Sequence, residues 1–359
     1  MNKRIILFGP LPPPHGGVAI YLKALTAHLS GSDIRVWTYT RPSQNDANVR
    51  FIAHRRLGTL WALLAEGRRS RILDATHFHL EYPNPLLLPI WLLLKRFLGF
   101  EWYKNILDGS LPKRYPQFGR MQRWLFRRGV KAVDEFVVVS DDLRLWLRDD
   151  MKVRQPITVI PCLLPPLQSE MEQAPSIEIE QSLAPYLSRD RRVCSIGVFF
   201  PSYGFQDVAY AVDELRKRTG KDIGLVLLDG GFVCDEGYRD EVLRDRGWIT
   251  VLTKVPNSDV YQILKHSDVF VRAVSEEGYG ISRVEALWCG TSVIATRVGE
   301  TRGMLLYDFG DREQLTSHLQ SVLFDVSAIH ENQWSEMYRK EAEENLVKLA
   351  GVLGLEIDT

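Results

Sequence analysis

The sequence predicts an α/β protein built from two doubly wound domains, and three observations support this fold class. Short, continuously apolar runs alternate with helical patterns along most of the 359 residues, which is typical of parallel strands covered on both faces. A proline-rich stretch over 161–190 interrupts the alternation, and a second series of the same kind follows it. The length also exceeds the roughly 150 residues of one ordinary domain. We therefore expect domains at 1–165 and 190–331 and a last helix over 332–353.

The first domain opens with an apolar run, Ile5 to Phe8, that predicts a strand. A loop rich in proline and glycine follows as far as Gly17, and apolar residues at helical spacing from Val18 to Leu29 predict a helix after it. Further β-like runs predict strands at 35–39, 75–79, 136–139 and 157–160.

The second series repeats this arrangement after the proline-rich stretch, which we interpret as an interdomain linker. Apolar runs predict strands at 193–197, 224–228, 268–271 and 292–295. Helices are expected at 206–218 and 283–288. One large doubly wound domain is the alternative interpretation, and the proline-rich break argues against it.

Composition excludes several classes of protein. Lys and Arg together number 45, as do Asp and Glu, so charge gives no reason to expect a nucleic-acid partner. The four cysteines are scattered and form no C-x-x-C pair, which favours reduced thiols in a cytoplasmic protein over disulfides or a zinc site. No segment approaches the roughly 20 apolar residues that cross a bilayer. We expect a soluble protein or one bound to a membrane surface.

The strongest motif runs from Glu277 to Leu287, after one predicted strand and into a helix. Gly278 and Gly280 let the backbone approach a ligand closely, and free amides at the helix start suit phosphate oxygens. Glu285 can accept hydrogen bonds from a ribose diol. The structural alternative is a capping box, because Ser282 and Glu285 have the S-x-x-E spacing.

This motif, with its two glutamates, its glycines around Tyr279 and the trailing residues 290–295, resembles the donor-site signature of the family 4 glycosyltransferases. The loop 12–17, with its Gly16–Gly17 pair, is similar to the first loop of that family. Three weaker matches, at 74–79, 137–140 and 159–161, follow in the family's order.

The resemblance implies the GT-B fold, in which two Rossmann-like domains face a cleft. The first domain, joined by the helix 332–353, would take the acceptor, and the second would hold a UDP- or GDP-linked sugar donor. It further implies a retaining hexosyl transfer that needs no metal or other cofactor, with an inverting route left open.

The site residues implied by the resemblance fall into two groups. Glu285 would hold the ribose, Glu277 and the backbone of Gly278, Tyr279, Gly280 and Ile281 would hold the donor sugar and phosphates, and Gly16 and Gly17 would close the phosphate side. His15 or Asp108 would face the reacting centre. The catalytic candidates are Asp108, His15 and Glu277.

Two departures from the family pattern matter. Asp108 stands where relatives carry a histidine, and a carboxylate cannot act as a cationic imidazole; a turn-capping aspartate is the alternative. Val198 and Tyr203 stand where relatives offer an arginine and a lysine to the donor diphosphate. Other cations must then neutralise that charge, and Arg272 and Arg283 are the candidates.

The stretch 95–131 carries ten Lys or Arg and two acidic residues, a local charge of 10 − 2 = +8. Six aromatic residues lie in or beside it: Trp91, Phe97, Trp102, Phe118, Trp124 and Phe126. This mixture suits an anionic membrane surface, and a lipid-linked or oligosaccharide acceptor would explain it. The alternative is a solvated helical face whose aromatics belong to the core.

We therefore predict a glycosyltransferase of bacterial-type surface polysaccharide assembly, cytoplasmic and peripheral on the inner face of the membrane. Two alternatives remain open at this stage. One is a non-catalytic relative that acts as a partner in such a complex, which Val198 and Tyr203 favour. The other is a nucleotide-sugar epimerase or hydrolase with the same architecture.

Overall fold

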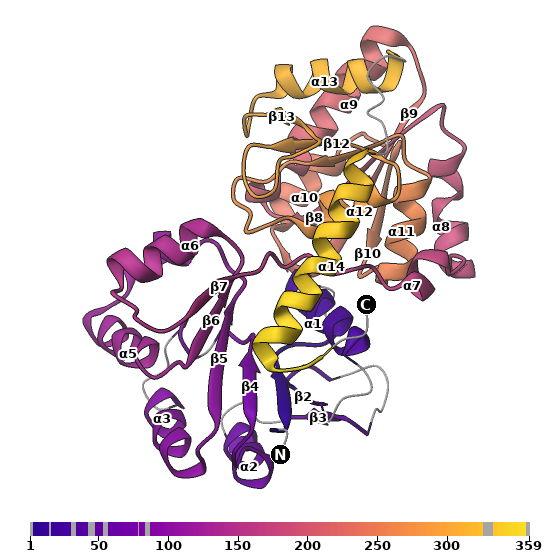
Figure 1. Ribbon diagram of the computed structural model, residues 1–359. Helices are drawn as coiled ribbons and strands as arrows, with labels where there is room; N and C mark the ends of the chain where they lie inside the picture. Colours follow the sequence, from indigo (N-terminus) through magenta and orange to yellow (C-terminus); the bar gives the residue numbers. More distant parts are fainter. Residues whose placement is uncertain are drawn as a thin grey trace. The chain divides into compact units, whose positions relative to one another are not determined.

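The computed structural model describes residues 3–13, 16–29, 34–41, 47–52, 57–77, 79–82, 87–325 and 333–356 (Figure 1). The chain forms two compact units. Unit 1 contains residues 1–165 and 342–359, and unit 2 contains residues 166–341. His15, one of the catalytic candidates, lies outside the described residues.

Unit 1 is built on a parallel sheet of seven described strands in the order β3-β2-β1-β4-β5-β6-β7. The strands are β1 (Ile5–Phe8), β2 (Ile34–Thr38), β3 (Val49–Phe51), β4 (Arg71–Asp74), β5 (Glu101–Ile106), β6 (Glu135–Val138) and β7 (Ile157–Val159). Their continuous burial follows from helices on both faces.

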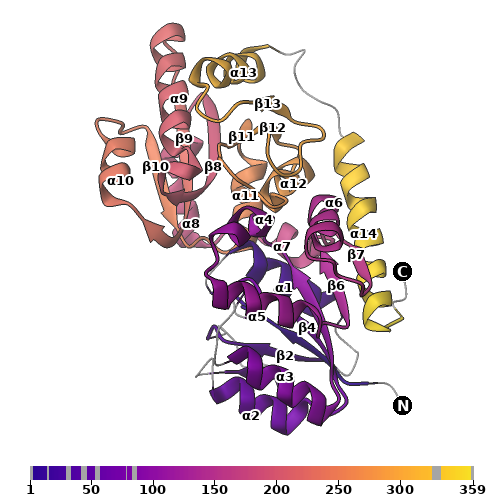
Figure 2. The same ribbon diagram turned by 90° about the vertical axis from the view of Figure 1, so that its left-hand side faces the viewer.

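The helices of unit 1 are α1 (Gly17–His28), α2 (Leu57–Glu66), α3 (Leu87–Leu98), α4 (Leu111–Arg114), α5 (Arg120–Val130) and α6 (Asp141–Leu145). Because crossovers between parallel strands are right-handed, the connection from β1 to β2 places α1 on one face. The later connections run the other way along the sheet and place α2, α3 and α5 on the opposite face. Figure 2 shows these three helices in front of the sheet.

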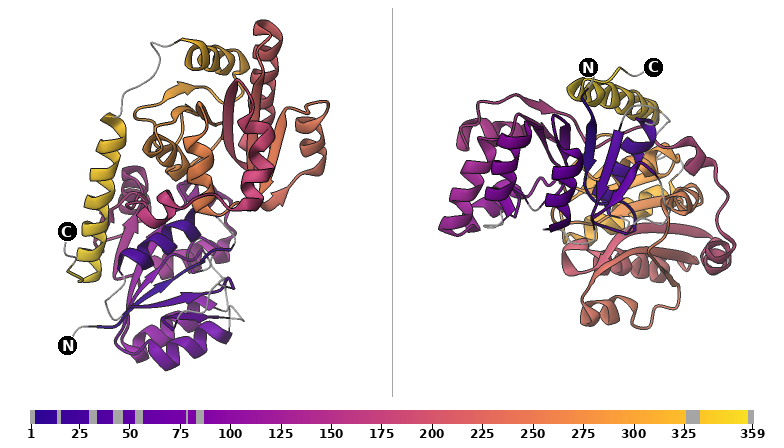
Figure 3. Two further views of the ribbon diagram at one scale, coloured as in Figure 1. Left: turned by 90° about the vertical axis from the view of Figure 1, so that its right-hand side faces the viewer. Right: turned by 90° about the horizontal axis from the view of Figure 1, so that it is seen from below.

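The face that carries α1 receives a second helix from the far end of the chain. This is α14 (Gln333–Leu353), whose C-terminal half belongs to unit 1. Leu349 and Leu353 are buried, Asn345 donates a hydrogen bond to the carbonyl of Leu163 at 3.2 Å, and Arg71 donates to the carbonyl of Leu353. Figure 3 shows α14 in yellow beside this unit.

Unit 2 has a parallel sheet of six described strands in the order β10-β9-β8-β11-β12-β13. The strands are β8 (Arg191–Phe199), β9 (Ile223–Cys234), β10 (Ile249–Thr253), β11 (Val269–Arg272), β12 (Ser292–Thr296) and β13 (Leu305–Tyr307).

Two hydrophobic clusters sandwich the sheet of unit 2. One lies under α9 (Phe205–Thr219), α10 (Glu236–Leu243) and α13 (Arg312–Phe324), with Val212 and Leu319 at its centre. The other lies under α8 (Ile177–Leu187), α11 (Asn257–Lys265) and α12 (Ile281–Trp288), with Ile263 and Ala286 at its centre. The α/β fold class with two doubly wound sheets is therefore confirmed.

Two details of the sequence-based prediction were wrong. The strand predicted at 75–79 ends before that range, because β4 covers Arg71–Asp74 and the next residues turn away from the sheet. The stretch 161–190 is not a bare linker: it contains α7 (Gln168–Glu172) and α8, whose Leu183 and Tyr186 are buried against the second sheet. Strands β3, β5, β10 and β13 are missing from the predicted strands.

Among the described residues no helix combines the length and the apolar character that a bilayer span requires.

Candidate active site

Each unit has one place where the order of its strands reverses, and ligands of doubly wound sheets bind beyond the carboxyl ends of the strands at such a place. In unit 1 the reversal lies between β1 and β4, and in unit 2 between β8 and β11. The residues that follow these four strands are therefore the first candidates for a site.

In unit 2 the residues after β11 lead into the start of α12. Gly280 is the N-cap residue and has φ of +89°, a conformation that favours glycine. No side chain caps the helix, and the amide of Arg283 donates to the carbonyl of Gly280 at 3.0 Å. The amides of Ile281 and Ser282 at the helix start suit an anion. The capping-box alternative is wrong, because the helix begins at Ile281 and Ser282 already lies inside it.

Glu285 points away from the helix end and toward α11. The carboxylate is buried, and its Oε1 accepts hydrogen bonds from the hydroxyl of Tyr261 at 3.2 Å and the amide of Asn257 at 3.4 Å. Burial raises the pKa of Glu285, although these two hydrogen bonds oppose the shift.

Arg272 ends β11 and binds Glu277 of the motif. Its Nε and Nη2 donate to Oε2 of Glu277 at 2.8 and 2.6 Å, and its Nη1 donates to the carbonyl of Ile196 in β8 at 2.6 Å. The guanidinium carbon lies 5.5 Å from the ring centroid of Tyr203. The Arg272 cation thus lies over Tyr203, the residue that the resemblance aligned with the family's lysine. Val198, aligned with the family's arginine, is buried.

Arg283 has a different environment. The side chain is fully buried, and its Nη1 donates to the carbonyls of Thr296, Val298 and Glu300 in the loop after β12. Burial lowers the pKa of Arg283 to about 10. This guanidinium organises the loop that packs against Tyr279, whose carbonyl accepts the amide of Glu300 at 2.8 Å. Both candidate cations lie near Glu277, and Arg272 is the one that forms a hydrogen-bonded ion pair with it.

In unit 1 the glycine pair opens α1. Gly16 is the N-cap residue and Gly17 the first helical residue. A Cβ atom added to either glycine would meet no heavy atom within 4 Å, so neither the backbone nor the packing of the described residues explains why both positions are glycine. Space beside the helix start is what an anionic ligand would need.

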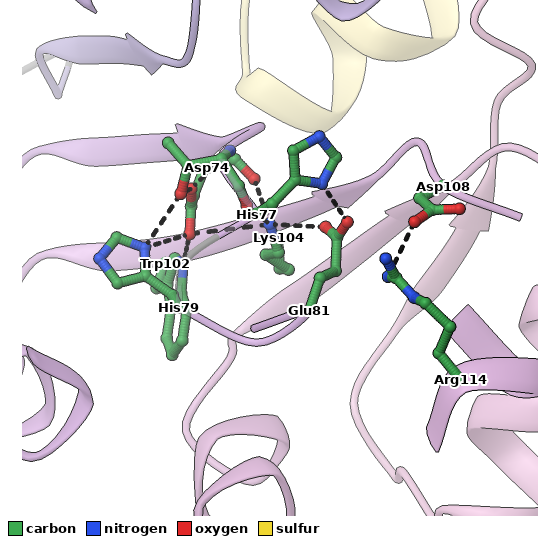
Figure 4. Close-up of polar contacts among 9 residues, drawn as sticks. Asp74, His77, His79, Glu81, Trp102, Lys104, Asp108 and Arg114 are labelled. Atoms are coloured by element: carbon green, nitrogen blue, oxygen red, sulfur yellow. Dashed lines mark hydrogen bonds and ion pairs between the residues drawn. The ribbon is translucent and has the colours of Figure 1, made fainter. Parts of the chain in front are cut away.

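Asp108, the third catalytic candidate, follows β5 and is engaged by two groups. Its Oδ1 accepts the amide of Ser110 at 2.8 Å, and its Oδ2 lies 2.8 Å from Nη2 of Arg114. The turn-capping role considered for this residue is therefore present, and an ion pair accompanies it (Figure 4).

The sequence analysis matched 74–79 to the family pattern but did not predict the buried polar cluster at the reversal point of unit 1. It consists of Asp74, Thr76, His77, His79, Glu81, Trp102 and Lys104 (Figure 4). Lys104 is fully buried in β5, although the local excess of charge suggested a surface role for this stretch. The sequence contained one indication of this position: Lys104 alternates with apolar residues along the strand.

Asp74 anchors this cluster at the end of β4. Its Oδ1 accepts the amide and hydroxyl of Thr76 at 2.9 and 2.6 Å, and its Oδ2 contacts Nδ1 of His79 at 2.8 Å and Nε1 of Trp102 at 3.0 Å. Burial alone would raise the pKa of Asp74, but Lys104, His79 and Thr76 together hold it well below its ordinary value. The carboxylate is therefore ionised in the folded protein.

The stretch 95–131 divides between surface and core. Trp91, Trp102, Phe118 and Phe126 are buried. They therefore cannot enter a membrane, contrary to the expectation from the sequence. Phe97 and Trp124 are exposed, on α3 and α5. Trp61 and Leu64 on α2, Leu93 on α3 and Met121 on α5 are also exposed.

Within the described residues, no group of three or more His, Cys, Asp or Glu side chains could hold a metal ion.

Two units with parallel sheets, each with polar groups beyond the reversal point of its sheet, define a two-domain doubly wound α/β protein. Residues 15–165 match the family model described as Glycosyltransferase Family 4, and residues 180–323 match the model described as Glycosyl transferases group 1. The two models match the two halves of one kind of protein, so the chain belongs to the family 4 glycosyltransferases and has the GT-B fold.

Solved structures agree with this assignment. HepE of Anabaena in complex with UDP and glucose has a TM-score of 0.71 at 14% identity, covering 98% of this chain and 100% of that one. WaaG, a glycosyltransferase involved in lipopolysaccharide biosynthesis, has a TM-score of 0.69 at 14% identity, with 97% and 99% covered. Sucrose-phosphate synthase from Thermosynechococcus elongatus has 0.67 at 17%, with 98% and 96% covered. A comparison with curated proteins finds no match.

Proposed function

We propose that this glycosyltransferase moves a hexose from a UDP- or GDP-linked donor to a glycan or lipid-linked acceptor in bacterial-type surface polysaccharide assembly. Transfer proceeds with retention of configuration and without a resident metal. Two similar structures support the substrate class by their names: HepE was solved with UDP-glucose, and WaaG acts in lipopolysaccharide biosynthesis.

The arrangement around the start of α12 carries this proposal. One short segment of unit 2 brings three groups together. They are a helix start without a side-chain cap, a buried carboxylate on the same helix, and an arginine at the end of the neighbouring strand. Amides and a guanidinium stabilise a diphosphate leaving group, and a buried carboxylate such as Glu285 binds a ribose diol.

The roles follow from these positions. Arg272 neutralises donor phosphate and replaces the cations that Val198 and Tyr203 cannot supply. Glu277 and the backbone from Gly278 to Ile281 hold the sugar and phosphates. The first amides of α1, at Gly16 and Gly17, bind an anionic group. Asp108 and His15 remain candidates for the reacting centre.

The test is nucleotide release from UDP-, GDP- and ADP-linked hexoses, with a bacterial lipid-linked oligosaccharide fraction as acceptor. We expect one donor to be consumed, Glu277→Gln to reduce the rate at least tenfold, and the exposed control Glu313→Gln to leave it unchanged. The anomeric configuration of the product, read by NMR, tests retention, and added EDTA tests independence of metal. Absence of nucleotide release from every donor would contradict the proposal.

A membrane-facing surface is the second part of the proposed function. Three neighbouring helices of unit 1, α2, α3 and α5, expose large apolar side chains outward, and we call these the apolar face: Trp61, Leu64, Leu93, Phe97, Met121 and Trp124. Arg96, Arg120 and Arg128 are exposed on the same helices, with the Arg128 guanidinium 5.3 Å from the ring centroid of Trp124. Apolar side chains among cations suit anionic lipid headgroups.

Flotation with phosphatidylglycerol vesicles tests this surface. The double variant Phe97→Ser, Trp124→Ser should remain at the bottom of the gradient while the wild type floats. Ile177→Ser is the matched control, because Ile177 and Phe97 are both 75% exposed but Ile177 lies in unit 2. A wild-type protein that stays at the bottom would refute the membrane role.

A further inference from the structure

The loop after β4, at the reversal point of unit 1, presents one imidazole to solvent and backs it with buried charge. His77 is 35% exposed at its side chain, whereas its partner Glu81 is 1% exposed. The carbonyl of His77 accepts the amide of Tyr82 at 2.8 Å. This backbone hydrogen bond joins residues 77 and 82 and restrains the position of the His77 side chain.

A fully buried lysine holds this loop against the sheet. Nζ of Lys104 donates to the carbonyls of Thr76 and Asp74, the latter at 3.2 Å, and lies 3.3 Å from Oε1 of Glu81. It also lies 3.9 Å from Oδ2 of Asp74. A buried ammonium requires such partners, and Glu81 is one of them.

The state of Glu81 decides the tautomer of His77. An ionised carboxylate only accepts hydrogen bonds, and its Oε2 contacts Nδ1 of His77 (Figure 4). In the subsite proposed below, Nδ1 donates to this carboxylate, and the lone pair of the ring lies on Nε2. Among the described residues no hydrogen bond to this Nε2 is found, and the side chain is 35% exposed. Nε2 then accepts a hydrogen bond from a donor such as a hydroxyl.

An aromatic residue, Tyr82, follows His77 by five positions, and the two are joined by the backbone hydrogen bond described above. Tyr82 is largely exposed, and the guanidinium carbon of Arg114 lies 4.6 Å from its ring centroid. Arg114 also donates to the Tyr82 hydroxyl and pairs with Asp108 at 2.8 Å. A fixed, exposed aromatic ring offers an apolar surface with a polar edge, which matches the C–H face and hydroxyls of a sugar ring.

The charges here favour a neutral ligand. Asp74, Glu81 and Asp108 carry three negative charges, and Lys104 and Arg114 carry two positive ones. These five groups together carry one negative charge. An anion such as phosphate is disfavoured by that balance, whereas a polyhydroxylated sugar is not.

We propose that His77 and Tyr82 form the acceptor-sugar subsite of unit 1, with His77 accepting a hydrogen bond from an acceptor hydroxyl through Nε2 and Tyr82 supporting the sugar ring. Glu81 and Lys104 are positioning residues that set the tautomer of His77. The inference deepens the proposed function, because it rests on a sugar acceptor.

Saturation-transfer NMR tests the subsite with millimolar methyl glycosides of glucose, galactose, mannose and N-acetylglucosamine. We expect signal for at least one glycoside with the wild type, loss in His77→Ala and Tyr82→Ala, and retention in Tyr82→Phe, which keeps the ring. His266→Ala, at an exposed histidine of unit 2, is the control and should bind as the wild type does. No signal with the wild type, or equal signal with folded His77→Ala, overturns the proposal.

A nitrogen-15 NMR experiment on the histidine rings gives a second, ligand-independent readout. His77, assigned by its absence in His77→Gln, should be protonated at Nδ1, and Glu81→Gln should change that tautomer population. Protonation at Nε2 in the wild type contradicts the subsite. UDP and GDP titrations of the same samples separate the two proposals: nucleotide binding without glycoside binding fails only the subsite, and glycoside binding without nucleotide binding fails only the donor proposal.

Discussion

The two reversal points of this enzyme share one topology but differ in where their charge lies. In unit 1 a lysine and two carboxylates are enclosed completely, and one imidazole reaches solvent from them. In unit 2 the buried cation is Arg283, which also holds a loop, and Arg272 and Glu277 beside the helix start are partly exposed. Both units thus bury a cation that holds a loop, and unit 2 adds a partly exposed ion pair, which we propose meets the donor phosphates.

The largest effect on stability is expected from replacing the buried lysine of unit 1. Lys104→Met leaves Asp74 and Glu81 buried without their cation, and breaking a buried ion pair costs about 3–5 kcal/mol. We expect a loss of that size in the free energy of unfolding from denaturant titration, whereas the exposed control Lys221→Met changes it little. A loss of less than about 1 kcal/mol would mean that the cluster does not depend on the lysine.

The displayed charge of unit 2 should affect binding instead of stability. Arg272→Ala removes a charged hydrogen-bond donor, and such bonds contribute about 1.5–3 kcal/mol, so donor affinity should fall about tenfold or more. Arg297→Ala is the matched control, because Arg297 forms a surface ion pair with Asp308. Unchanged donor affinity in folded Arg272→Ala would remove this residue from the donor site.

These two clusters also differ in how far the sequence predicts them. The unit 2 motif is continuous from Glu277 to Glu285, so local spacing and the family resemblance find it. The unit 1 cluster joins Asp74, Glu81 and Lys104, which are up to 30 positions apart and meet only because β4 and β5 are neighbours. The sequence analysis placed Lys104 on a basic surface, because its alternation with apolar residues indicates a strand but does not show that the lysine is buried. The strand order of the whole sheet was needed.

A pH effect of intermediate size is expected from the loop that Arg283 organises. Burial alone would raise the pKa of Glu300, but hydrogen bonds and charge from Arg302 and the amide of Thr301 lower it to about 2. A carboxylate with a lowered folded pKa stabilises the protein above its unfolded value of about 4.3, and this stability is lost as the pH falls toward 2.

Glu300→Gln removes that proton linkage. The slope of the unfolding free energy between pH 4.3 and 2 should decrease by up to about 1.4 kcal/mol per pH unit. Denaturant titrations at several pH values measure it, with exposed Glu313→Gln as the control. An unchanged slope would show that the Arg302 contact does not hold the carboxylate ionised.

The smallest change in stability is expected at the start of α1. Gly17 has helical backbone and open space around its Cα, so Gly17→Ala should stabilise the fold by up to about 1 kcal/mol. If a ligand phosphate occupies that space, the added methyl group should nevertheless reduce sugar transfer. Thermal unfolding and donor turnover measure the two effects, and full activity would indicate that no ligand approaches this glycine.

Calorimetric titration with UDP, GDP and ADP tests the central claim, that nucleotide binding belongs to unit 2 and the buried cluster of unit 1 serves another ligand. We expect one nucleotide to bind the wild type, Glu285→Ala to weaken this binding at least tenfold, and His77→Ala to leave it within twofold. Unit 2 is not the nucleotide site if no nucleotide binds the folded protein, or if His77→Ala weakens binding as much as Glu285→Ala does.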